Sequence, residues 1–406
     1  MEKICVGFIG VGRRAPGLLQ TVLNNFADVD VVAICDSYQD KAEKGRELVK
    51  KWRDYDCKVY TDYKELLADD QVDAVVITAS WEAHVPLAVA CMKAGKITAL
   101  EVGGAYCIED CWQLVRIYQE TKTPFMFLEN CCYGERELLA NSLVRHGVFG
   151  EVVHCHGAYV HDCRQQIADG INLRHYRQRN YLSRNGDNYP THDLGPIAKI
   201  LNINRGNRMM SLVSVASKAR GMQEYVKDKE EYAHLRDMVW MQGDIVETII
   251  TCADGATISL KLDTTLPHPY GREFTVCGTK GCYREDGNVV YEDSMKLNKG
   301  EGMSNYYNSA NDYKEKYLPA CWKNITQEEL ESGHGGMDVL LFKAFFDAIK
   351  KGEEMPIDVY DAASWMAITC LSEQSVRTGG HPVEIPDFTS GQWLLREPKD
   401  IVDFGC

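Results

Sequence analysis

Two segments of this chain carry residue types and spacings that are typical of reactive sites, and the first is rich in glycine. In Ile9–Ala15, Gly10 and Gly12 follow a short apolar run, and Ala15 opens an amphipathic stretch. The first glycine permits a tight turn, the second lets a pyrophosphate approach the backbone, and Ala15 occupies a close-packing position. Asp36 ends the next apolar run, where a carboxylate accepts hydrogen bonds from the ribose hydroxyls of NAD and repels the extra phosphate of NADP. The pattern predicts an NAD site.

Two arginines in this glycine-rich segment leave the choice of cofactor open. A guanidinium of Arg13 or Arg14 is able to bind either the pyrophosphate or the 2′-phosphate of NADP. A glycine-rich turn that binds no ligand is the remaining alternative. The carboxylate of Asp36 favours NAD over NADP and over a turn that binds no ligand.

The second segment, Gly186–Pro196, combines a tyrosine and a histidine with several polar residues. Asn188 or Thr191 is the expected cap of a helix that starts here, which would set Tyr189 and His192 in its first turn and facing one cleft. A histidine titrates near neutrality, and a phenol exchanges a proton when a cation lies close. The segment therefore predicts proton transfer, and a hydrogen-bonded core histidine is the alternative that the residue types leave open.

Other histidines allow different interpretations. His154, His156 and His161, with Asp162 and Cys163, form a possible metal site, because the first two share one face of a predicted strand. We expect no metal there. His334–Asp338 is interpreted as a helix start and loop closure rather than as a catalytic motif.

The elements that must position these residues fall into two patterns. Short β-branched runs alternate with longer amphipathic stretches up to Leu128, which is typical of βαβ units and a parallel sheet. After Glu129, alternating strands predominate, with two late helices. We therefore predict an α/β protein in which residues 1–128 form a doubly wound Rossmann domain that binds NAD. Residues 129–406 are predicted to form a substrate-binding α+β domain with a large, largely antiparallel open sheet, and Asn298–Asn324 is expected to be a long loop.

The composition excludes several classes of function. The 406 residues carry 45 Lys and Arg against 59 Asp and Glu, a formal charge of −14, which argues against nucleic-acid and anionic-membrane partners. The sequence has no run of about 18 apolar residues and no recognisable signal peptide. Its 16 cysteines are scattered without a CxxC pair and are interpreted as reduced thiols. These features predict a cytoplasmic protein.

Two segments just past predicted strands, Thr78–His84 and Leu100–Ala105, resemble the Gfo/Idh/MocA oxidoreductase family in order and spacing. Within it, the chain resembles glycoside hydrolase family 109, the NAD-dependent α-N-acetylgalactosaminidases. The matching segments are Glu129–Gly134, Gly157–Asp162, Tyr189–His192, Ile203–Gly206, Pro269–Tyr270, His334–Asp338 and Asp358–Ala363. The resemblance implies a small-molecule or glycan substrate.

The resemblance also implies roles for individual residues. Those expected to touch NAD, besides Gly10 and Gly12, are Arg14, Ala15, Asp36, Trp81 through His84, Glu101, Val102, Asn130 and Tyr189. Those expected to line the sugar site are Tyr159, Arg177, Tyr189, His192 and Tyr270. The implied mechanism is transient oxidation of the sugar at C3, elimination of the C1 substituent, water addition and re-reduction. His192 is expected at the C3 hydroxyl, Tyr270 as the base at C2, and Arg177 as a binding charge.

Departures from the family pattern keep other functions open. Val102 stands where many sugar dehydrogenases of the superfamily carry a lysine that assists proton transfer, which counts against a net dehydrogenase or epimerase. Gly103-Gly104 and Asp193 replace residues that are usual in family 109. Asp193 is expected to reshape the pocket or raise the pKa of the adjacent His192. A non-catalytic NAD-dependent sensor is a third possibility, and an uncovered sheet face predicts a homodimer or homotetramer.

Overall fold

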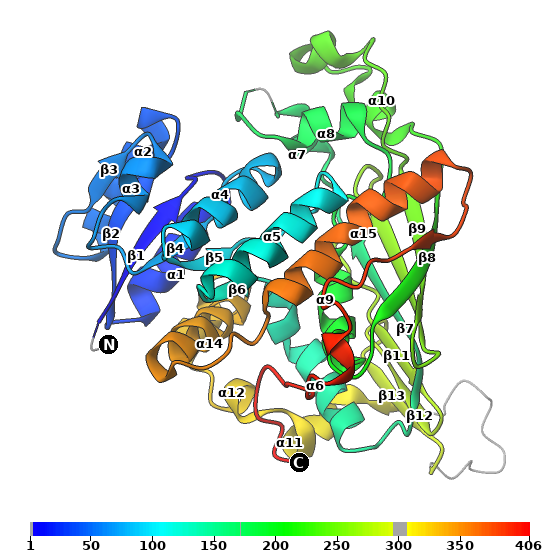
Figure 1. The fold of residues 1–406 in the computed structure, drawn as a ribbon. Coiled ribbons are helices and arrows are strands. Elements are labelled where there is room, and N and C mark those ends of the chain that lie inside the picture. The colour runs from blue at the N-terminus through cyan, green and yellow to red at the C-terminus, as the bar shows by residue number, and fades with distance from the viewer. Residues whose placement is uncertain (1–2, 171, 295–306) are drawn as a thin grey trace. The chain divides into compact units, whose positions relative to one another are not determined.

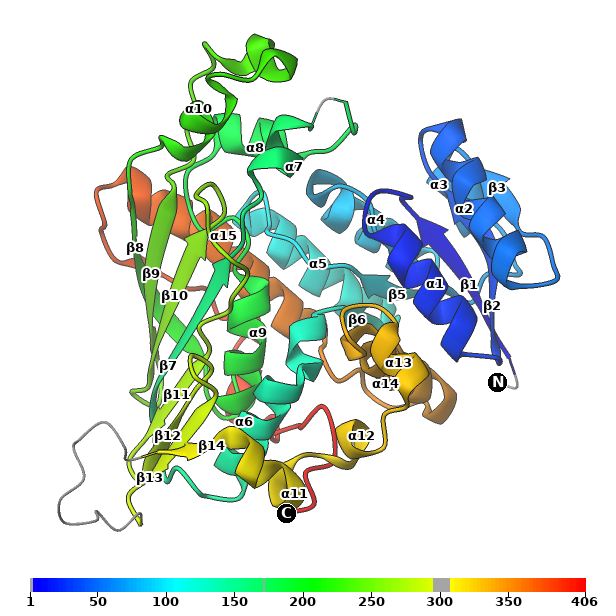
Figure 2. The same cartoon turned by 180° about the vertical axis from the view of Figure 1, so that it is seen from behind.

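The computed structural model describes residues 3–170, 172–294 and 307–406 (Figures 1 and 2). Its contacts group the chain into two compact units. The first comprises Met1–Tyr133 and Asn324–Met366, and the second comprises Gly134–Lys323 and Ala367–Cys406. A late segment therefore joins the N-terminal unit, a return that no local pattern indicates. The domain boundary at residue 128 stays a prediction.

The first unit is built on a six-stranded parallel sheet in the order β3-β2-β1-β4-β5-β6, the order of a doubly wound dinucleotide-binding fold. The strands are β1 (Ile4–Ile9), β2 (Val29–Cys35), β3 (Lys58–Tyr60), β4 (Ala74–Ile77), β5 (Ile97–Leu100) and β6 (Phe125–Phe127). Strand β3 has only three residues, which are too few to show a period in the sequence.

The helices of this unit pack in groups on the sheet (Figure 1). They are α1 (Ala15–Asn25), α2 (Gln39–Trp52), α3 (Tyr63–Leu67), α4 (Trp81–Lys93), α5 (Ile108–Thr121), α13 (Gln327–Glu331) and α14 (Met337–Lys351). Helix α1 packs against α2 and also against α14, which comes from the late segment, and α4 packs against α5. Helix α14 begins directly after Gly336, as the interpretation of His334–Asp338 predicted.

The second unit contains a nine-stranded sheet in the order β14-β13-β12-β11-β7-β10-β9-β8-β15. Its strands are β7 (Val152–Val160), β8 (Met209–Ala216), β9 (Ile245–Cys252), β10 (Thr257–Asp263), β11 (Thr275–Gly278), β12 (Gly281–Arg284), β13 (Val289–Glu292), β14 (Asn308–Ser309) and β15 (Val383–Glu384). Strands β7 and β10 pair in parallel, and the other pairs are antiparallel. The predicted fold class, a parallel Rossmann sheet plus a largely antiparallel sheet, is confirmed.

Helices α6 (Glu135–Arg145) and α9 (Thr191–Ile200) lie on one face of this sheet (Figure 2). Close packing of α9 on β7 requires Gly157, because a Cβ added there would lie 2.8 Å from the Cβ of Asp193. Asp193 is only 2% exposed. The side chain that departs from the family pattern is therefore packed between helix and sheet, opposite a glycine.

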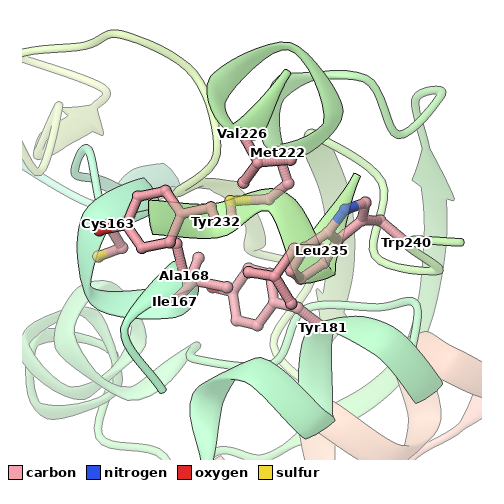
Figure 3. Close-up of a cluster of buried hydrophobic side chains, with 9 residues drawn as sticks. All are labelled: Cys163, Ile167, Ala168, Tyr181, Met222, Val226, Tyr232, Leu235 and Trp240. Carbon is pink, nitrogen blue, oxygen red and sulfur yellow. The ribbon is translucent and has the colours of Figure 1, made fainter. Parts of the chain in front are cut away.

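A small satellite core lies at one end of the large sheet (Figure 3). It is formed by the segment containing α7 (Arg164–Ala168), α8 (Arg177–Ser183), α10 (Gly221–Val226) and the 3₁₀ turn η2 (Glu230–Leu235). Its buried members include Tyr181, Met222, Tyr232 and Trp240. The core ties down α8, which carries Arg177 at its first position.

The prediction of an extended loop at Asn298–Asn324 is wrong for its described part. Residues 308–323 form β14, a 3₁₀ turn at Ala310–Tyr313, α11 (Lys314–Tyr317) and α12 (Ala320–Lys323). Tyr313, Leu318 and Trp322 are buried and fix these short elements, which are too short to show helical periodicity. Residues 298–306 lie outside the described part of the chain.

In the described ranges, the structure has no helix that is both long and apolar enough to cross a bilayer. The later helix α15 (Val359–Arg377) is long but carries several charged residues. None of the 16 cysteines forms a disulfide bond in the structure.

Candidate functional site

The glycine-rich segment forms the turn between β1 and α1. Gly10 has φ +95°, and a Cβ there would lie 2.6 Å from the backbone of Ala79. Above Gly12, by contrast, the nearest atom to an added Cβ is 4.0 Å away. Gly10 thus serves the tight turn, and the space above Gly12 leaves room for a phosphate to approach the backbone. Ala15 is fully buried at the start of α1.

Asp36 follows β2 and faces this turn. Its Oδ2 accepts a hydrogen bond from the backbone N–H of Val11 at 2.7 Å, and its Oδ1 accepts one from that of Tyr38 at 2.9 Å. The carboxylate is therefore held beside the glycine turn. Since a carboxylate has about four acceptor positions, two bonds leave capacity for ribose hydroxyls.

Arg14 lies at the centre of a charged cluster in the same unit. Its Nε donates to Glu101 Oε1 at 3.0 Å, and its Nη1 and Nη2 donate to Asp338 at 2.8 and 2.7 Å. Nη1 also lies 2.8 Å from His334 Nδ1. Binding a 2′-phosphate through this guanidinium would require breaking these ion pairs, which favours NAD over the NADP alternative.

Electrostatics reinforce this cluster. Burial disfavours a charge on Arg14, but attraction to Glu101 and Asp338 outweighs it and raises the pKa of Arg14. Burial likewise disfavours ionisation of Asp338, yet hydrogen bonds from His334 and Arg14 hold the pKa of that carboxyl well below its usual range. Asn130 Nδ2 donates to Asp338 Oδ1 at 2.8 Å. Three residues expected at the cofactor, Arg14, Glu101 and Asn130, are thus connected through Asp338 or Arg14.

Trp81 and His84 begin helix α4, after β4. Trp81 Nε1 donates to the carbonyl of Val102 at 3.1 Å, and its ring fills the space that a side chain at position 103 would need. His84 Nε2 lies 3.1 Å from the carbonyl of Ala79. Burial lowers the pKa of His84 to about 4, so the ring is neutral at pH 7.

The second nitrogen of His84 is free to bind a ligand. In the described ranges, Nδ1 is buried and has no hydrogen-bond partner. When Nε2 donates to Ala79, Nδ1 is an acceptor that a ligand hydroxyl or amide would satisfy. Together with the open space above Gly12, this orphaned acceptor fits a bound dinucleotide. The predicted cofactor residues of this unit lie at the carboxyl ends of its parallel strands, where such folds bind ligands.

The predicted sugar-site residues converge in the second unit around Tyr159, near the end of β7. Its ring centroid lies 4.6 Å from that of Tyr189, 5.5 Å from that of His192 and 6.3 Å from that of Tyr270. Arg177 lies over the Tyr189 ring, with its guanidinium carbon 5.2 Å from the centroid. The structure therefore brings together all five residues. The predicted contact of Tyr189 with NAD stays a prediction.

Tyr189 and His192 face one another at the start of α9. The hydroxyl of Tyr189 lies 3.0 Å from His192 Nε2. The predicted cap is wrong, because the helix begins at Thr191, its N-cap is Pro190, and neither Asn188 nor Thr191 caps it with a side chain. Asn188 instead donates through Nδ2 to Gln242 Oε1 at 2.9 Å. Proline supplies a fixed φ at this helix start instead of a side-chain acceptor.

Burial and charge act in opposite directions on Tyr159. Burial raises the pKa of the phenol well above its usual value, and the positive charge of Arg177 works against that increase. Tyr159 therefore stays protonated at neutral pH and is a hydrogen-bond donor. The half-exposed Tyr270 is the phenol of this cluster that solvent reaches most readily.

The structure adds three residues to this cluster that the sequence interpretation did not place there. The ring of His161 is perpendicular to that of Tyr270 at 5.4 Å. Arg272 Nη1 donates to the hydroxyl of Tyr270 at 3.0 Å, and Arg272 Nε donates to Glu137 Oε1 at 2.6 Å. Alternation along an extended segment puts residues 270 and 272 on one side, and that signal was available in the sequence.

The two histidines of β7 that were considered as metal ligands have other partners in the structure. His154 Nδ1 lies 2.8 Å from Thr257 Oγ1, and His156 Nδ1 lies 2.8 Å from Ser259 Oγ, both across the pair with β10. In the part of the chain that the structure describes, His154, His156, His161, Asp162 and Cys163 do not form a cluster with converging ligand atoms. These strand histidines bond to neighbouring hydroxyls.

Two family models match successive parts of the chain. Residues 4–128 match the family described as "Oxidoreductase family, NAD-binding Rossmann fold", and residues 133–395 match "Glycosyl hydrolase 109, C-terminal domain". The α-N-acetylgalactosaminidase of Tannerella forsythia is 38% identical over 97% of this chain and 87% of its own length. That of Shewanella oneidensis is 37% identical over 99% of this chain and 88% of its own length.

A solved structure shows the same fold at low identity. The oxidoreductase from Agrobacterium radiobacter, in complex with NAD⁺, L-tartaric acid and magnesium, has a TM-score of 0.68 at 15% identity and covers 94% of this chain and 98% of its own. The family match over residues 133–395 spans more than half of the sequence, and the relatives span nearly all of it. The chain therefore belongs to glycoside hydrolase family 109 and is a glycoside hydrolase with an NAD-binding Rossmann domain.

Proposed function

We propose that this protein cleaves terminal N-acetylgalactosaminide-type glycosides, using tightly bound NAD that is recycled in each turnover. One observation carries the proposal: Tyr159, Arg177, Tyr189, His192 and Tyr270 form a single cluster within the family 109 domain. The relatives named α-N-acetylgalactosaminidase support the choice of sugar.

The side chains of the cluster supply the proton transfers that the reaction needs. Bound NAD would accept a hydride from C3 of the sugar and return it at the end. His192 takes the proton of the C3 hydroxyl, with Tyr189 3.0 Å from its Nε2 as an orienting partner. Tyr270 removes the C2 proton, which the neighbouring C3 ketone acidifies, and the C1 substituent leaves. Arg177 provides a positive charge for binding.

The experiment that tests this function uses purified protein without added NAD and a panel of nitrophenyl glycosides. We expect p-nitrophenol release from the α-N-acetylgalactosaminide, with no net accumulation of NADH. In D₂O, mass spectrometry should find deuterium at C2 of the released sugar, because the abstracted proton exchanges with solvent before water adds. Cleavage that leaves C2 fully protonated would contradict the elimination route, since displacement with two carboxylates does not touch C2.

A net sugar dehydrogenase or epimerase is the alternative function on this scaffold. Val102 disfavours it, because its side chain is apolar and cannot assist proton transfer, and its carbonyl accepts a hydrogen bond from Trp81. In the same panel, steady NADH formation from a free sugar without glycoside cleavage would favour the dehydrogenase.

Asp36 provides a test of the cofactor site. We expect Asp36→Ala to weaken NAD binding by about 1–3 kcal/mol, the cost of leaving hydroxyl–carboxylate bonds unmade. Affinity for NADP relative to NAD should increase, because the repelling charge is gone. Titration of cofactor-free protein with each dinucleotide measures both values, and Asp54→Ala, an exposed position, is the matched control. An unchanged affinity for NAD would exclude Asp36 from the site.

We also propose that the protein is a cytoplasmic homo-oligomer, a dimer or a tetramer. Val215 on β8 and Ile249 on β9 are 55% and 54% exposed, and both alternate along their strands with buried residues, so they lie on the outer face of the sheet. Exposed β-branched side chains on one face of an open sheet are candidates for burial against a second copy of the chain. Sixteen cysteines without a disulfide bond are compatible with a reducing compartment. A molar mass equal to one chain by light scattering would contradict the oligomer, and recovery of the protein outside the cytoplasm on cell fractionation would contradict the location.

A further inference from the structure

The guanidinium of Arg272 lies within hydrogen-bonding distance of the Tyr270 hydroxyl. Both belong to an extended segment in which Gly271 pairs with Val160 at the end of β7, so their side chains emerge on the same side. Arg272 Nη1 donates to Tyr270 Oη at 3.0 Å. Arg272 is only 9% exposed, whereas Tyr270 is 54% exposed. The phenol thus meets solvent with a buried guanidinium directly behind its oxygen.

A buried carboxylate holds the other side of this guanidinium. Glu137, on α6, is 2% exposed; its Oε1 accepts a hydrogen bond from Arg272 Nε at 2.6 Å and forms an ion pair with Arg272 Nη2 at 2.5 Å. Burial raises the pKa of Glu137, although the charge of Arg272 opposes the increase. In the described part of the chain, Glu137 Oε2 is buried without a hydrogen-bond partner. A charged residue kept half-satisfied in the interior is costly for stability, which indicates a role other than stability.

We propose that Arg272, anchored by Glu137, is a positioning residue whose positive charge prepares the Tyr270 phenol to act as the base at C2 of the sugar. A phenol is a poor base at neutral pH unless a cation stabilises its anion. The hydrogen bond from Arg272 points at the oxygen where that anion forms. The inference rests on the proposed function and deepens it.

The step balances as follows. With C3 oxidised to a ketone, the Tyr270 phenolate takes the C2 proton, so that the C2–H bond breaks and a phenol O–H bond forms. The electron pair left at C2 forms the C1=C2 double bond. The bond from C1 to the leaving oxygen breaks, and that oxygen takes the electron pair and then a proton from solvent. Arg272 changes no bond and stabilises the negative charge on Tyr270 before the transfer.

Other groups that face Tyr270 must be considered in any pH measurement. The ring of His161 lies 5.4 Å from that of Tyr270, and the ring of Tyr159 lies 6.3 Å away, both from the end of β7. His268, two residues earlier in the same segment, has its Nδ1 3.3 Å from the carbonyl of Pro269. Arg272 donates a hydrogen bond to the Tyr270 hydroxyl and carries a permanent positive charge.

The test follows the titration of Tyr270 directly, by NMR of full-length protein labelled at the ζ carbon of tyrosine. The signal that disappears from the spectrum of Tyr270→Phe is assigned to Tyr270. We expect Arg272→Met to move the titration midpoint of this signal up by about one pH unit, the lower end of the effect of a neighbouring opposite charge, because the phenol is half-exposed. Arg272→Lys should restore most of the shift. Arg284→Met, an exposed arginine on β12, is the matched control.

Glu137→Gln separates this proposal from a purely structural role. It keeps an acceptor for Arg272 but removes the negative charge that partly cancels the guanidinium, so the Tyr270 midpoint should move down. If the two substitutions acted only by disturbing the packing, the titration midpoint of Tyr270 would shift in the same direction in Arg272→Met and Glu137→Gln. An unchanged midpoint in Arg272→Met, or shifts of the same sign in the two variants, would overturn the proposal.

Turnover supplies a second and separate result. With the α-N-acetylgalactosaminide in D₂O, Arg272→Met should lower the rate of deuterium incorporation at C2 about tenfold at neutral pH, and the rate should recover at alkaline pH. Equal rates of incorporation in wild type and Arg272→Met at all pH values would overturn the role in catalysis. Failure of the wild type to cleave any glycoside would instead overturn the proposed function, and the titration would still test the coupling between Arg272 and Tyr270.

Discussion

Replacing His192 with alanine is expected to reduce kcat/KM for glycoside cleavage by about 10²–10⁴-fold, the usual contribution of a positioned acid–base group. The imidazole is fixed in the sugar cluster by the hydroxyl of Tyr189, 3.0 Å from its Nε2, and by the Tyr159 ring. Oxidation at C3 precedes every later step in the proposed route. The variant should therefore lose cofactor reduction, deuterium exchange at C2 and cleavage together.

The pattern of loss distinguishes His192 from Tyr270. Tyr270→Phe should slow exchange and cleavage while the cofactor is still reduced by bound substrate, because its role follows the oxidation. Single-turnover absorbance of NADH separates the two steps, and His234→Ala, an exposed histidine on η2, is the matched control. Normal cofactor reduction in His192→Ala would assign the C3 proton to another residue.

Structural features that depend on a few consecutive residues could be predicted from the sequence. The turn at Gly10, the carboxylate at the end of β2 and the start of α14 each depend on a few consecutive residues, and the structure has all three. Tyr189 and His192 were singled out by the residue types of one segment, whereas Tyr159, Arg177 and Tyr270 were found only through resemblance to a family. The structure supplies the distances that show them in one cluster.

Contacts between residues that are far apart in the sequence could not be predicted. Arg272 and Glu137 are separated by 135 residues, and Arg14 and Asp338 by 324. No local pattern shows that a charged side chain in an amphipathic helix or loop will meet its partner in the interior.

The Arg14 cluster predicts the second large effect, on stability. Asp338 is fully buried and accepts hydrogen bonds from Arg14 and Asn130, with His334 Nδ1 3.0 Å away. Removing one partner of a buried ion pair typically costs 3–5 kcal/mol, because it leaves the other charge uncompensated. Arg14 keeps Glu101 and its side chain is 26% exposed, so we expect about 3 kcal/mol for Asp338→Asn. For a unit of this size, that corresponds to a fall of roughly 6–12 °C in Tm.

Thermal unfolding of Asp338→Asn should be compared with that of Asp347→Asn, a partly exposed aspartate on the same helix. Equal Tm values for the two variants would show that the pair contributes nothing to stability.

The pH dependence of stability gives an independent check. Because the folded state holds the pKa of Asp338 below its ordinary value, the stabilisation is fully present above the unfolded carboxyl pKa of about 3.9. It is lost as the pH falls from there through the folded pKa, so the difference between wild type and Asp338→Asn should be constant near neutrality and shrink below about pH 4. Since Arg14 is the residue that leads from the glycine turn into α1, the same loss should weaken NAD binding, and the two effects should follow the same dependence on pH.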